Sequence, residues 1–321
     1  MTVNLRSILV MALAAGCHLS GQLAPTATKK IDVIAAQILQ DTGAPSVSLA
    51  IVKDGKIAYV KAYGNARIEP KAPARSDMRY AIGSVSKQFM ACAILLLVQD
   101  GKISLDDPVG RFLPDLTRAN EITVRQLLTH TSGYQDYYPL DYVAPFMLNP
   151  VTARAILEQW AKKPLDFDPG TRWQYSNTNF VAAGSILERV TGMPLMSFLE
   201  TRIFRPLGIT SPIDLTQHPP GNSDAAGYTR FAFGPLRLVP PEGPGWLFAA
   251  DELGMTARDL AVWDISLIEH KLLKPDSLDT MITPARLKNG APTGYGLGVG
   301  VTDSGNHPKL SHGGTVSGFV S

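Results

Sequence analysis

Cysteine is scarce in this sequence. Only Cys17 and Cys92 occur among 321 residues, which is too few for a disulfide framework. No cluster of cysteine and histidine has the spacing of a zinc site. Removal or acylation of Cys17 would leave Cys92 without a partner, so we expect no disulfide in the mature chain.

An excess of charge of one sign is also lacking. The formal net charge is +2, 18% of the residues are charged, and neither half carries a basic run. We therefore expect neither nucleic acid nor an anionic membrane surface as a partner. With 45% hydrophobic residues and no low-complexity tract, the composition is that of a folded protein with a substantial core.

The N-terminus has no apolar run long enough to span a membrane. Arg6 precedes a short apolar run, residues 8–15, which ends in small residues. This order matches the n-region, h-region and cleavage site of a secretory signal. We expect residues 1–24 to be a signal segment and the protein to be exported, either to the periplasm or into the medium.

Cys17 leaves the fate of that segment open. It closes the stretch Leu-Ala-Ala-Gly-Cys, which resembles a bacterial lipoprotein acylation box, although Ala14 stands where a larger aliphatic residue is usual. Three interpretations remain: lipidation with a membrane anchor at Cys17, ordinary cleavage and release, and an apolar N-terminus without targeting function.

Hydrophobic periodicity and turn residues predict the elements of the first part of the chain. A helix over residues 30–41 is stopped by Gly43 and Pro45. Strands over 46–52 and 56–63 are joined by Lys-Asp-Gly, a hairpin signal. The stretch 84–99 is apolar nearly all round, which predicts a buried helix ended by Gly101.

The remaining elements indicate an α/β (α+β) architecture. Further expected helices are 124–129, 151–162, 178–190, 194–204 and 256–270; residues 211–245 form a loop region, and strands follow at 295–302 and 309–321. We expect one antiparallel sheet built from both ends and flanked by helices, with an inserted all-helical subdomain. The predicted domain is 25–321, with an α/β part over about 30–83 and 250–321 and a helical part over about 84–249.

One four-residue motif in the sequence is typical of hydrolase active sites. There is no Gly-x-Ser-x-Gly elbow, no His-Glu-x-x-His and no phosphate-binding loop, but Ser84-Val85-Ser86-Lys87 is the only Ser-x-x-Lys. It opens the most apolar helix, so Lys87 can lie beside Ser84 on one face, where the helix N-terminus favours an oxyanion. A desolvated lysine can act as a base. The alternative is a serine N-cap with a solvent-facing lysine.

Two further groups carry polar side chains suited to acyl transfer. In Tyr175-Ser176-Asn177 the tyrosine can be held as phenolate or pass a proton to a leaving group, and Asn177 offers a donor and an acceptor to a substrate amide or ester. The alternative is helix capping, and Tyr63-Gly64-Asn65 repeats the Tyr-x-Asn pattern at a second position.

The last strand region contains His312-Gly313-Gly314-Thr315. Two glycines allow a backbone to approach a ligand closely, and a strand edge presents N–H groups to a carbonyl oxygen. An ordinary strand histidine is the alternative for His312. A cluster of aromatic residues after residue 133 either rims the site or packs in the core: Tyr134, Tyr137, Tyr138, Tyr142 and Phe146.

In this chain order, Ser-x-x-Lys, Tyr-x-Asn and His-x-Gly resemble the three motifs of serine β-lactamases and penicillin-binding proteins. The wider sequence resembles the class C-like branch, which includes class C β-lactamases, DD-carboxypeptidases, D-aminopeptidases and esterases. Similar stretches lie at residues 104–109, 127–133, 169–170, 206–208 and 295–298, so that the resemblance runs from about residue 30 to the end.

The resemblance implies roles for individual residues. Ser84 would be the nucleophile, Lys87 and Tyr175 would share general-base and general-acid work, and Asn177 would position the substrate. The backbone N–H groups of Ser84 and Thr315 would form the oxyanion hole, beside Gly314. It implies an acyl-enzyme hydrolysed by water and no metal or organic cofactor. The implied substrates are small molecules or cell-wall peptides: esters, D-amino-acid peptides or β-lactams.

The chain departs from the family pattern at two points. His312 stands where class C β-lactamases have lysine, and histidine holds a carboxylate only when it is protonated, near pH 6.5 if unperturbed. This favours peptidase or esterase activity over efficient β-lactamase activity. Relatives also continue beyond the position of Ser321 with further strands and a helix, so we expect C-terminal elements to be missing. The rival prediction is therefore a non-catalytic envelope protein that binds peptidoglycan fragments in the same cleft.

Overall fold

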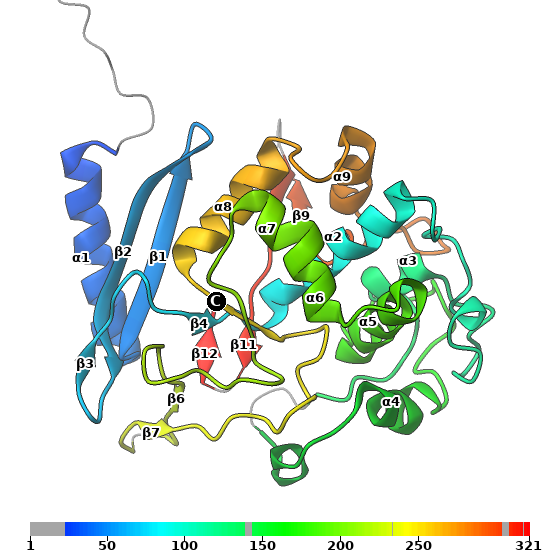
Figure 1. Cartoon of the computed structure of the whole chain (residues 1–321), viewed down its shortest axis with the longest axis horizontal. Coiled ribbons are helices and arrows are strands. Elements are labelled where there is room, and N and C mark those ends of the chain that lie inside the picture. Colours follow the sequence, from blue (N-terminus) through cyan, green and yellow to red (C-terminus); the bar gives the residue numbers. More distant parts are fainter. Residues whose placement is uncertain (1–22, 139–142, 233, 304–307, 317) are drawn as a thin grey trace, which may run out of the picture.

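The computed structural model describes residues 23–138, 143–232, 234–303, 308–316 and 318–321. The predicted signal segment lies outside the described residues except for its last two positions, and so do Cys17 and Tyr142. The fold class is confirmed: helices pack around antiparallel ladders in an α/β arrangement (Figure 1).

The N-terminal elements follow the predicted pattern. Helix α1 (Pro25–Thr42) ends at Gly43, and β1 (Ser46–Lys53), β2 (Lys56–Arg67) and β3 (Ala72–Pro73) form an antiparallel ladder in that order. Asp54 and Gly55 between β1 and β2 have φ values of 51° and 69°, as the predicted hairpin turn requires. Helix α1 covers one side of this ladder and α8 (Ala257–Ile268) the other (Figure 1).

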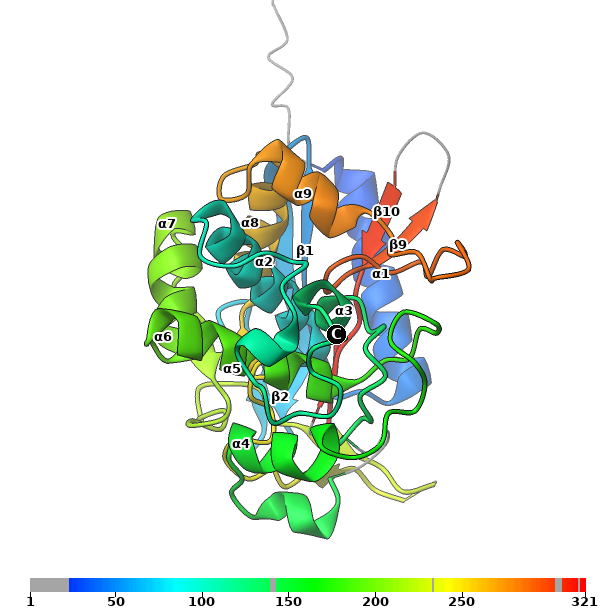
Figure 2. The same ribbon diagram turned by 90° about the vertical axis from the view of Figure 1, so that its right-hand side faces the viewer.

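Helix α2 (Ser86–Gln99) lies at the centre of the molecule (Figures 1 and 2). The predicted buried helix is confirmed, since nearly every side chain from Ser86 to Leu97 is buried. Phe89 packs against Trp263 and Phe204 with ring centroids 4.4 and 5.7 Å away. A 3₁₀ turn, Gly83–Val85, precedes α2, so Ser84 lies one turn ahead of the α-helix and does not cap it.

Short helices surround α2 on the side away from the N-terminal ladder (Figure 2). These are α3 (Val124–Leu128), α4 (Ala153–Ile156), α5 (Asn177–Thr191), α6 (Leu195–Leu199) and α7 (Arg205–Leu207), with π turns at Leu157–Ala161 and Glu200–Phe204. They match the predicted helices. Helix α9 (Pro275–Ile282) was not expected.

The expected single sheet from both chain ends is not present among the described residues. Separate two-stranded ladders are formed by β9 (Gly300–Asp303) with β10 (Pro308–Ser311), and by β11 (Thr315–Val316) with β12 (Phe319–Val320). The predicted strand 309–321 is broken because Gly313 and Gly314 interrupt it and Gly318, at a φ of 79°, turns the chain back.

The predicted helical part over 84–249 also contains strands. Strand β5 (Ile213–Asp214) pairs with β8 (Leu253–Met255), and β6 (Tyr228–Thr229) pairs with β7 (Arg237–Leu238). The proline- and glycine-rich loop therefore returns to the α/β part of the molecule.

One short ladder has direct consequences for the site. Strand β4 (Tyr80–Ala81) pairs with β8 so that Tyr80 faces Met255 and Ala81 faces Gly254, and the Ile82 N–H donates to the Leu253 carbonyl at 3.0 Å. Continuing this antiparallel register by three residues brings Ser84 opposite the segment just before β8.

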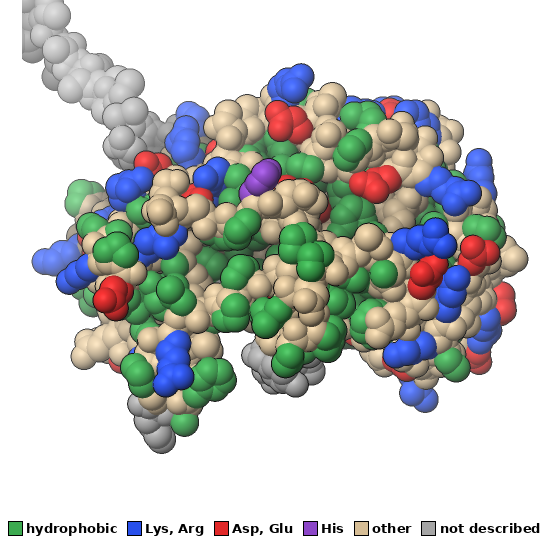
Figure 3. Space-filling view, turned by 60° about the horizontal axis from the view of Figure 1, so that its bottom comes forward, with side chains coloured by type: hydrophobic (Ala, Val, Ile, Leu, Met, Phe, Trp, Pro, Cys, Tyr) green, Lys and Arg blue, Asp and Glu red, His purple; other side chains and the backbone are tan. Residues whose placement is uncertain are grey.

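Surface charge and burial agree with the composition. On the face shown in Figure 3, Lys, Arg, Asp and Glu side chains lie mainly around the rim, and apolar side chains occupy the middle. Within the described ranges, no helix is long and apolar enough to cross a membrane, and no three candidate ligand side chains gather as a metal would need. Cys92 is buried in α2 as a free thiol.

Candidate active site

Ser84 lies at the meeting point of two polar side chains. Its Oγ donates a hydrogen bond to Asp251 Oδ1 at 2.6 Å, and Lys87 Nζ donates to Ser84 Oγ at 2.8 Å. The β4–β8 register brings Asp251 opposite Ser84, and helical spacing brings Lys87 beside it. The hydroxyl is half-buried and lines a surface cleft.

Lys87 is fully buried, which excludes the alternative of a solvent-facing lysine. Its Nζ is 3.0 Å from the Ala250 carbonyl and 3.5 Å from Asp251 Oδ1, in addition to its contact with Ser84. Three acceptors thus match the three N–H bonds of an ammonium group. Burial lowers the pKa of Lys87, whereas the charges of Asp251 and Asp136 raise it.

Tyr175 lies against the lysine with its ring 5.1 Å from Lys87 Nζ. Its hydroxyl is buried and has no hydrogen-bond partner of good geometry among the described residues. Burial raises the pKa of Tyr175 well above its ordinary value, and the Asp251 charge raises it further, although Ser84 acts in the opposite direction. The tyrosine is therefore a neutral phenol near pH 7, and the phenolate interpretation is disfavoured.

Asn177 begins α5 and is oriented by a carboxylate. Its backbone N–H and its Nδ2 donate to the two oxygens of Asp136, at 2.9 and 3.3 Å. The amide Oδ1 is buried, has no partner in the part of the chain that the structure describes, and is left as an acceptor for a substrate N–H group. The capping alternative fails for Ser176, whose side chain makes no cap hydrogen bond.

The third motif brings a backbone N–H close to Ser84. Gly314 and Ser321 exchange backbone hydrogen bonds of 3.0 and 2.8 Å, so the next pair, Thr315 and Val320, is a non-hydrogen-bonded pair. The Thr315 N–H therefore points away from β12. A Cβ added to Gly83 would meet the Thr315 nitrogen at 2.9 Å, which places this N–H beside the turn that carries Ser84.

Gly314 is required by the same close approach. A Cβ added at this position would lie 2.1 Å from the Ile82 carbonyl oxygen and 2.9 Å from the Ser84 nitrogen. Any side chain there would push the strand away from Ser84. The N–H groups of Ser84 and Thr315 are thus neighbours, and the first turn of a helix leaves its N–H groups without intrahelical acceptors. Two such donors suit a developing oxyanion.

His312 does not have the properties expected of a carboxylate-binding cation. Its Nε2 is 2.7 Å from the Tyr295 hydroxyl and its Nδ1 is 2.6 Å from the Gly313 carbonyl oxygen. Burial lowers the pKa of His312 to about 4, and the charge of Lys87 contributes. The pKa of His312 is thus perturbed from the value near 6.5 that an unperturbed imidazole would have. The imidazole is neutral at pH 7, with Nδ1–H donating to Gly313 and Nε2 accepting from Tyr295.

The cleft that joins these groups has a volume of about 390 Å³, a size typical of small-molecule sites. All of the predicted site residues except the buried Lys87 line it. Among the described residues, the lining contains no Lys or Arg and one acidic side chain, Asp136. The lining residues are Ser84, Asp136, Tyr138, Tyr175, Asn177, His312, Gly313, Gly314, Thr315, Val320 and Ser321. The cleft therefore offers an anionic substrate no exposed cation.

The aromatic residues that follow residue 133 do not share one role: some pack in the core, and one lies at the rim of the cleft. Tyr134 and Tyr137 are buried core residues, with only 1% and 3% of their surface exposed. Tyr138 lines the cleft, and its hydroxyl donates to Glu242. Phe146 is half-exposed beside Trp246. Only Tyr138 is therefore an aromatic rim residue among those described.

Comparison with known proteins gives the family. The family model described as Beta-lactamase matches residues 31–321. The chain belongs to this family. It is 28% identical over 279 residues to penicillin-binding protein 4* of Bacillus subtilis (strain 168), covering 83% of this chain and 62% of that protein. The chain thus spans about three fifths of the length of that curated relative.

Two solved structures show the same fold. The D-stereospecific amidohydrolase from Streptomyces sp. has a TM-score of 0.76 and 30% identity, over 89% of this chain and 88% of that one. The D-amino acid amidase from Ochrobactrum anthropi SV3, complexed with L-phenylalanine amide, has a TM-score of 0.75 and 29% identity, over 90% and 85% of the two chains. The resemblance to the β-lactamase and penicillin-binding protein group is confirmed.

Several residues of this β-lactamase-family site were not predicted. Asp251 and Asp136 each contact a predicted residue, but no motif marks them. Tyr295 contacts His312 and lies in the family-like stretch 295–298, although no role was expected for it. His130 is also buried there, with its ring centroid 4.2 Å from that of Tyr175. His130 lies in one of the stretches that carry the family resemblance, which was the only signal available for it.

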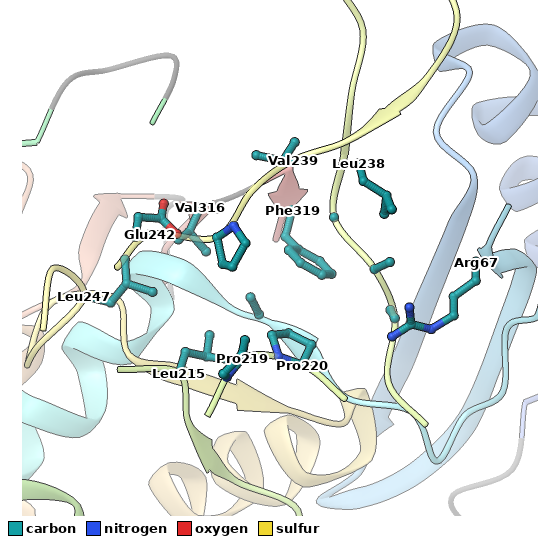
Figure 4. A pocket seen from close by; sticks show the side chains of 15 residues that line it. Arg67, Leu215, Pro219, Pro220, Leu238, Val239, Glu242, Leu247, Val316 and Phe319 are labelled. Carbon is teal, nitrogen blue, oxygen red and sulfur yellow. The ribbon is translucent and has the colours of Figure 1, made fainter. Parts of the chain in front are cut away.

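A second cavity lies behind the β11–β12 hairpin and is mostly apolar (Figure 4). Leu215, Leu247, Val316 and Phe319 line it, and Arg67 lies at one side. None of Ser84, Lys87 or Tyr175 lines this cavity. We therefore place the chemistry in the cleft at Ser84 and not in this cavity.

The neutral state of His312 can be measured directly. In ¹⁵N-histidine-labelled protein, the ring nitrogens of His312 should titrate with a midpoint near pH 4. A folded pKa below the unfolded value of about 6.5 means that the neutral-ring contribution to stability is present above pH 6.5 and lost as pH falls toward 4. H312Q should therefore lose less stability over that interval. A His312 midpoint at or above pH 6.5 would contradict the burial argument.

Proposed function

We propose that this protein is a serine hydrolase that forms an acyl-enzyme on Ser84. The observation that carries the proposal is the position of Ser84 Oγ. It contacts a buried ammonium and a buried carboxylate on one side, and the neighbouring N–H groups of Ser84 and Thr315 lie at the same turn. Nucleophile activation and oxyanion stabilisation are the two requirements of acyl transfer.

The reaction would proceed in two steps. Ser84 Oγ attacks the substrate carbonyl carbon while its proton passes to a neighbouring group, and the carbonyl oxygen receives hydrogen bonds from the two N–H groups. The leaving group departs with a proton, for which Lys87 and the neutral Tyr175 are the nearest donors. Water then hydrolyses the ester on Ser84 and regenerates the hydroxyl.

The charges that line the cleft favour a cationic substrate over an anionic one. With His312 neutral and no exposed Lys or Arg in the described lining, an anionic substrate gains nothing. Burial raises the pKa of Asp136, while hydrogen bonds from Asn177 and Tyr138 and the charge of Lys87 lower it, and in its ionised form Asp136 favours a cation. Asn177 Oδ1 offers an acceptor to an N–H group. We therefore propose amides or esters of D-amino acids with a free amino group in preference to β-lactams, whose carboxylate requires a cation. The names of the Streptomyces and Ochrobactrum relatives agree with this choice.

Export is part of the proposal. The signal-like composition of residues 1–24 supports a location in the periplasm or medium, and Cys17 would provide a lipid anchor if it is acylated. D-Amino-acid derivatives are components of cell-wall peptides, so the substrate class and the location are compatible.

The rival function is peptide binding without catalysis in the same cleft. The two differ in whether Ser84 reacts covalently. A fluorophosphonate probe should label the wild-type protein at Ser84, as mapped by peptide mass spectrometry. S84A should fold and remain unlabelled, with a lower melting temperature, because Lys87 and Asp251 each lose a hydrogen-bond partner. A wild-type protein that binds D-amino-acid peptides without labelling would support the binding function instead.

The substrate class is tested with three substrates that share one leaving group and differ in charge. D-Phenylalanine p-nitroanilide, its N-acetyl form and its N-succinyl form present an ammonium, a neutral amide and a carboxylate. We expect kcat/KM to fall by about tenfold at each step, and so by about hundredfold from the first substrate to the last, because each step lowers the substrate charge by one unit near a carboxylate at an effective dielectric constant of about 20. D136N should reduce this preference. Equal values for the three substrates, or the highest value for the succinyl form, would contradict charge selection.

A further inference from the structure

Asp251 occupies a position that the three family motifs do not account for. Its carboxylate is only 3% exposed, and Oδ1 accepts the hydrogen bond donated by Ser84 Oγ at 2.6 Å. It comes from the segment just before β8, far from the motif residues in sequence, and the β4–β8 register delivers it to Ser84. A short bond from the nucleophile to a buried carboxylate is the geometry of a base and its proton donor.

The other two groups at Ser84 are placed as donors. Lys87 Nζ has three acceptors within 3.5 Å, namely Ser84 Oγ, the Ala250 carbonyl and Asp251 Oδ1. Burial lowers its pKa, but this set of acceptors matches the three N–H bonds of an ammonium group. Tyr175 is a neutral phenol, because burial raises its pKa. His312 uses both ring nitrogens elsewhere. Among the described residues, the Ser84 proton therefore has one acceptor, Asp251 Oδ1.

We propose that Asp251 is the general base that accepts the Ser84 proton, and that Lys87 acts as a cation and proton donor. This rests on the proposed acyl-serine function and changes the role that the family resemblance implies for Lys87. Asp251 contacts the reacting oxygen directly, so it is a catalytic residue in this proposal.

The proton transfers balance over one turnover. In acylation the Ser84 O–H bond breaks, Asp251 takes the proton, and Oγ bonds to the carbonyl carbon. As the bond to the leaving group breaks, the Lys87 ammonium gives that group a proton, and Asp251, 3.5 Å away, returns a proton to the lysine. In deacylation water loses a proton to Asp251 as it attacks the ester, and the departing Ser84 oxygen takes that proton back.

The pH dependence of the reaction depends on every titratable group around Asp251. Among the described residues, one cation, Lys87, faces Asp251. The other titratable side chains that interact with Asp251 are Tyr137, Tyr138, Tyr175, Glu252, Tyr295 and His312. Burial raises the pKa of each of these tyrosines and of Glu252, and lowers that of His312. The tyrosines and His312 are therefore neutral near pH 7, and the cation that lies against Asp251 is Lys87, with Nζ 3.5 Å from Oδ1.

The test measures the rate of Ser84 labelling by a fluorophosphonate probe in the full chain from pH 5 to pH 9. D251N keeps the shape of the side chain and removes the base, so it should lower the rate by about hundredfold. E252Q changes the adjacent buried carboxyl group, which does not contact Ser84, and should stay within about twofold of wild type.

A second variant keeps the test decisive if D251N is poorly folded. D251A leaves room for a small carboxylate, so added formate should accelerate its labelling, and formate should not affect E252Q. If D251N reacts as fast as or faster than wild type, Lys87 is the base and the proposal is wrong. A D251A variant that formate does not accelerate also contradicts it. Failure of the wild-type protein to label at Ser84 would instead overturn the proposed hydrolase function.

Discussion

The burial of one ammonium group determines how this site is built. Lys87 lies on the most apolar helix of the protein and is fully buried, so each of its N–H bonds must meet an acceptor inside the protein. An unpaired charge there would cost several kcal/mol. Ser84 Oγ, the Ala250 carbonyl and Asp251 meet this requirement together. The same contacts that stabilise the charge therefore place the nucleophile against a carboxylate.

Close backbone packing supplies the second half of the site. The β4–β8 ladder brings the turn before α2 against the segment that carries Ala250 and Asp251, and Gly314 allows the last hairpin to approach the same turn. Neither approach involves a long strand. Short stretches of strand pairing bring together donors from three distant parts of the chain. Glycine stands where a Cβ would collide with the neighbouring backbone.

The sequence predicted local features well because they depend on local patterns. The apolar run made α2 recognisable, the Asp-Gly turn marked the first hairpin, and the three motifs named residues that line one cleft, with Lys87 beneath it. The expected continuous sheet was wrong, since register between distant short strands is decided by tertiary packing.

Asp251, Asp136 and the state of His312 were missed for the same reason. Asp251 reaches Ser84 only through the β4–β8 pairing, and Asp136 holds Asn177 from a loop about forty residues earlier. The low pKa of His312 comes from its burial beside Lys87, which no spacing along the chain reveals. Contacts of this kind become visible only when the chain is folded.

The central claim is that Ser84 becomes acylated during turnover. Rapid acid quenching of the wild-type protein with D-phenylalanine methyl ester, followed by peptide mass spectrometry, measures this directly. We expect a phenylalanyl ester on Ser84 that appears before steady state and disappears as substrate is exhausted. Turnover of the ester without any acylated Ser84, or with the acyl group on another residue, would contradict it.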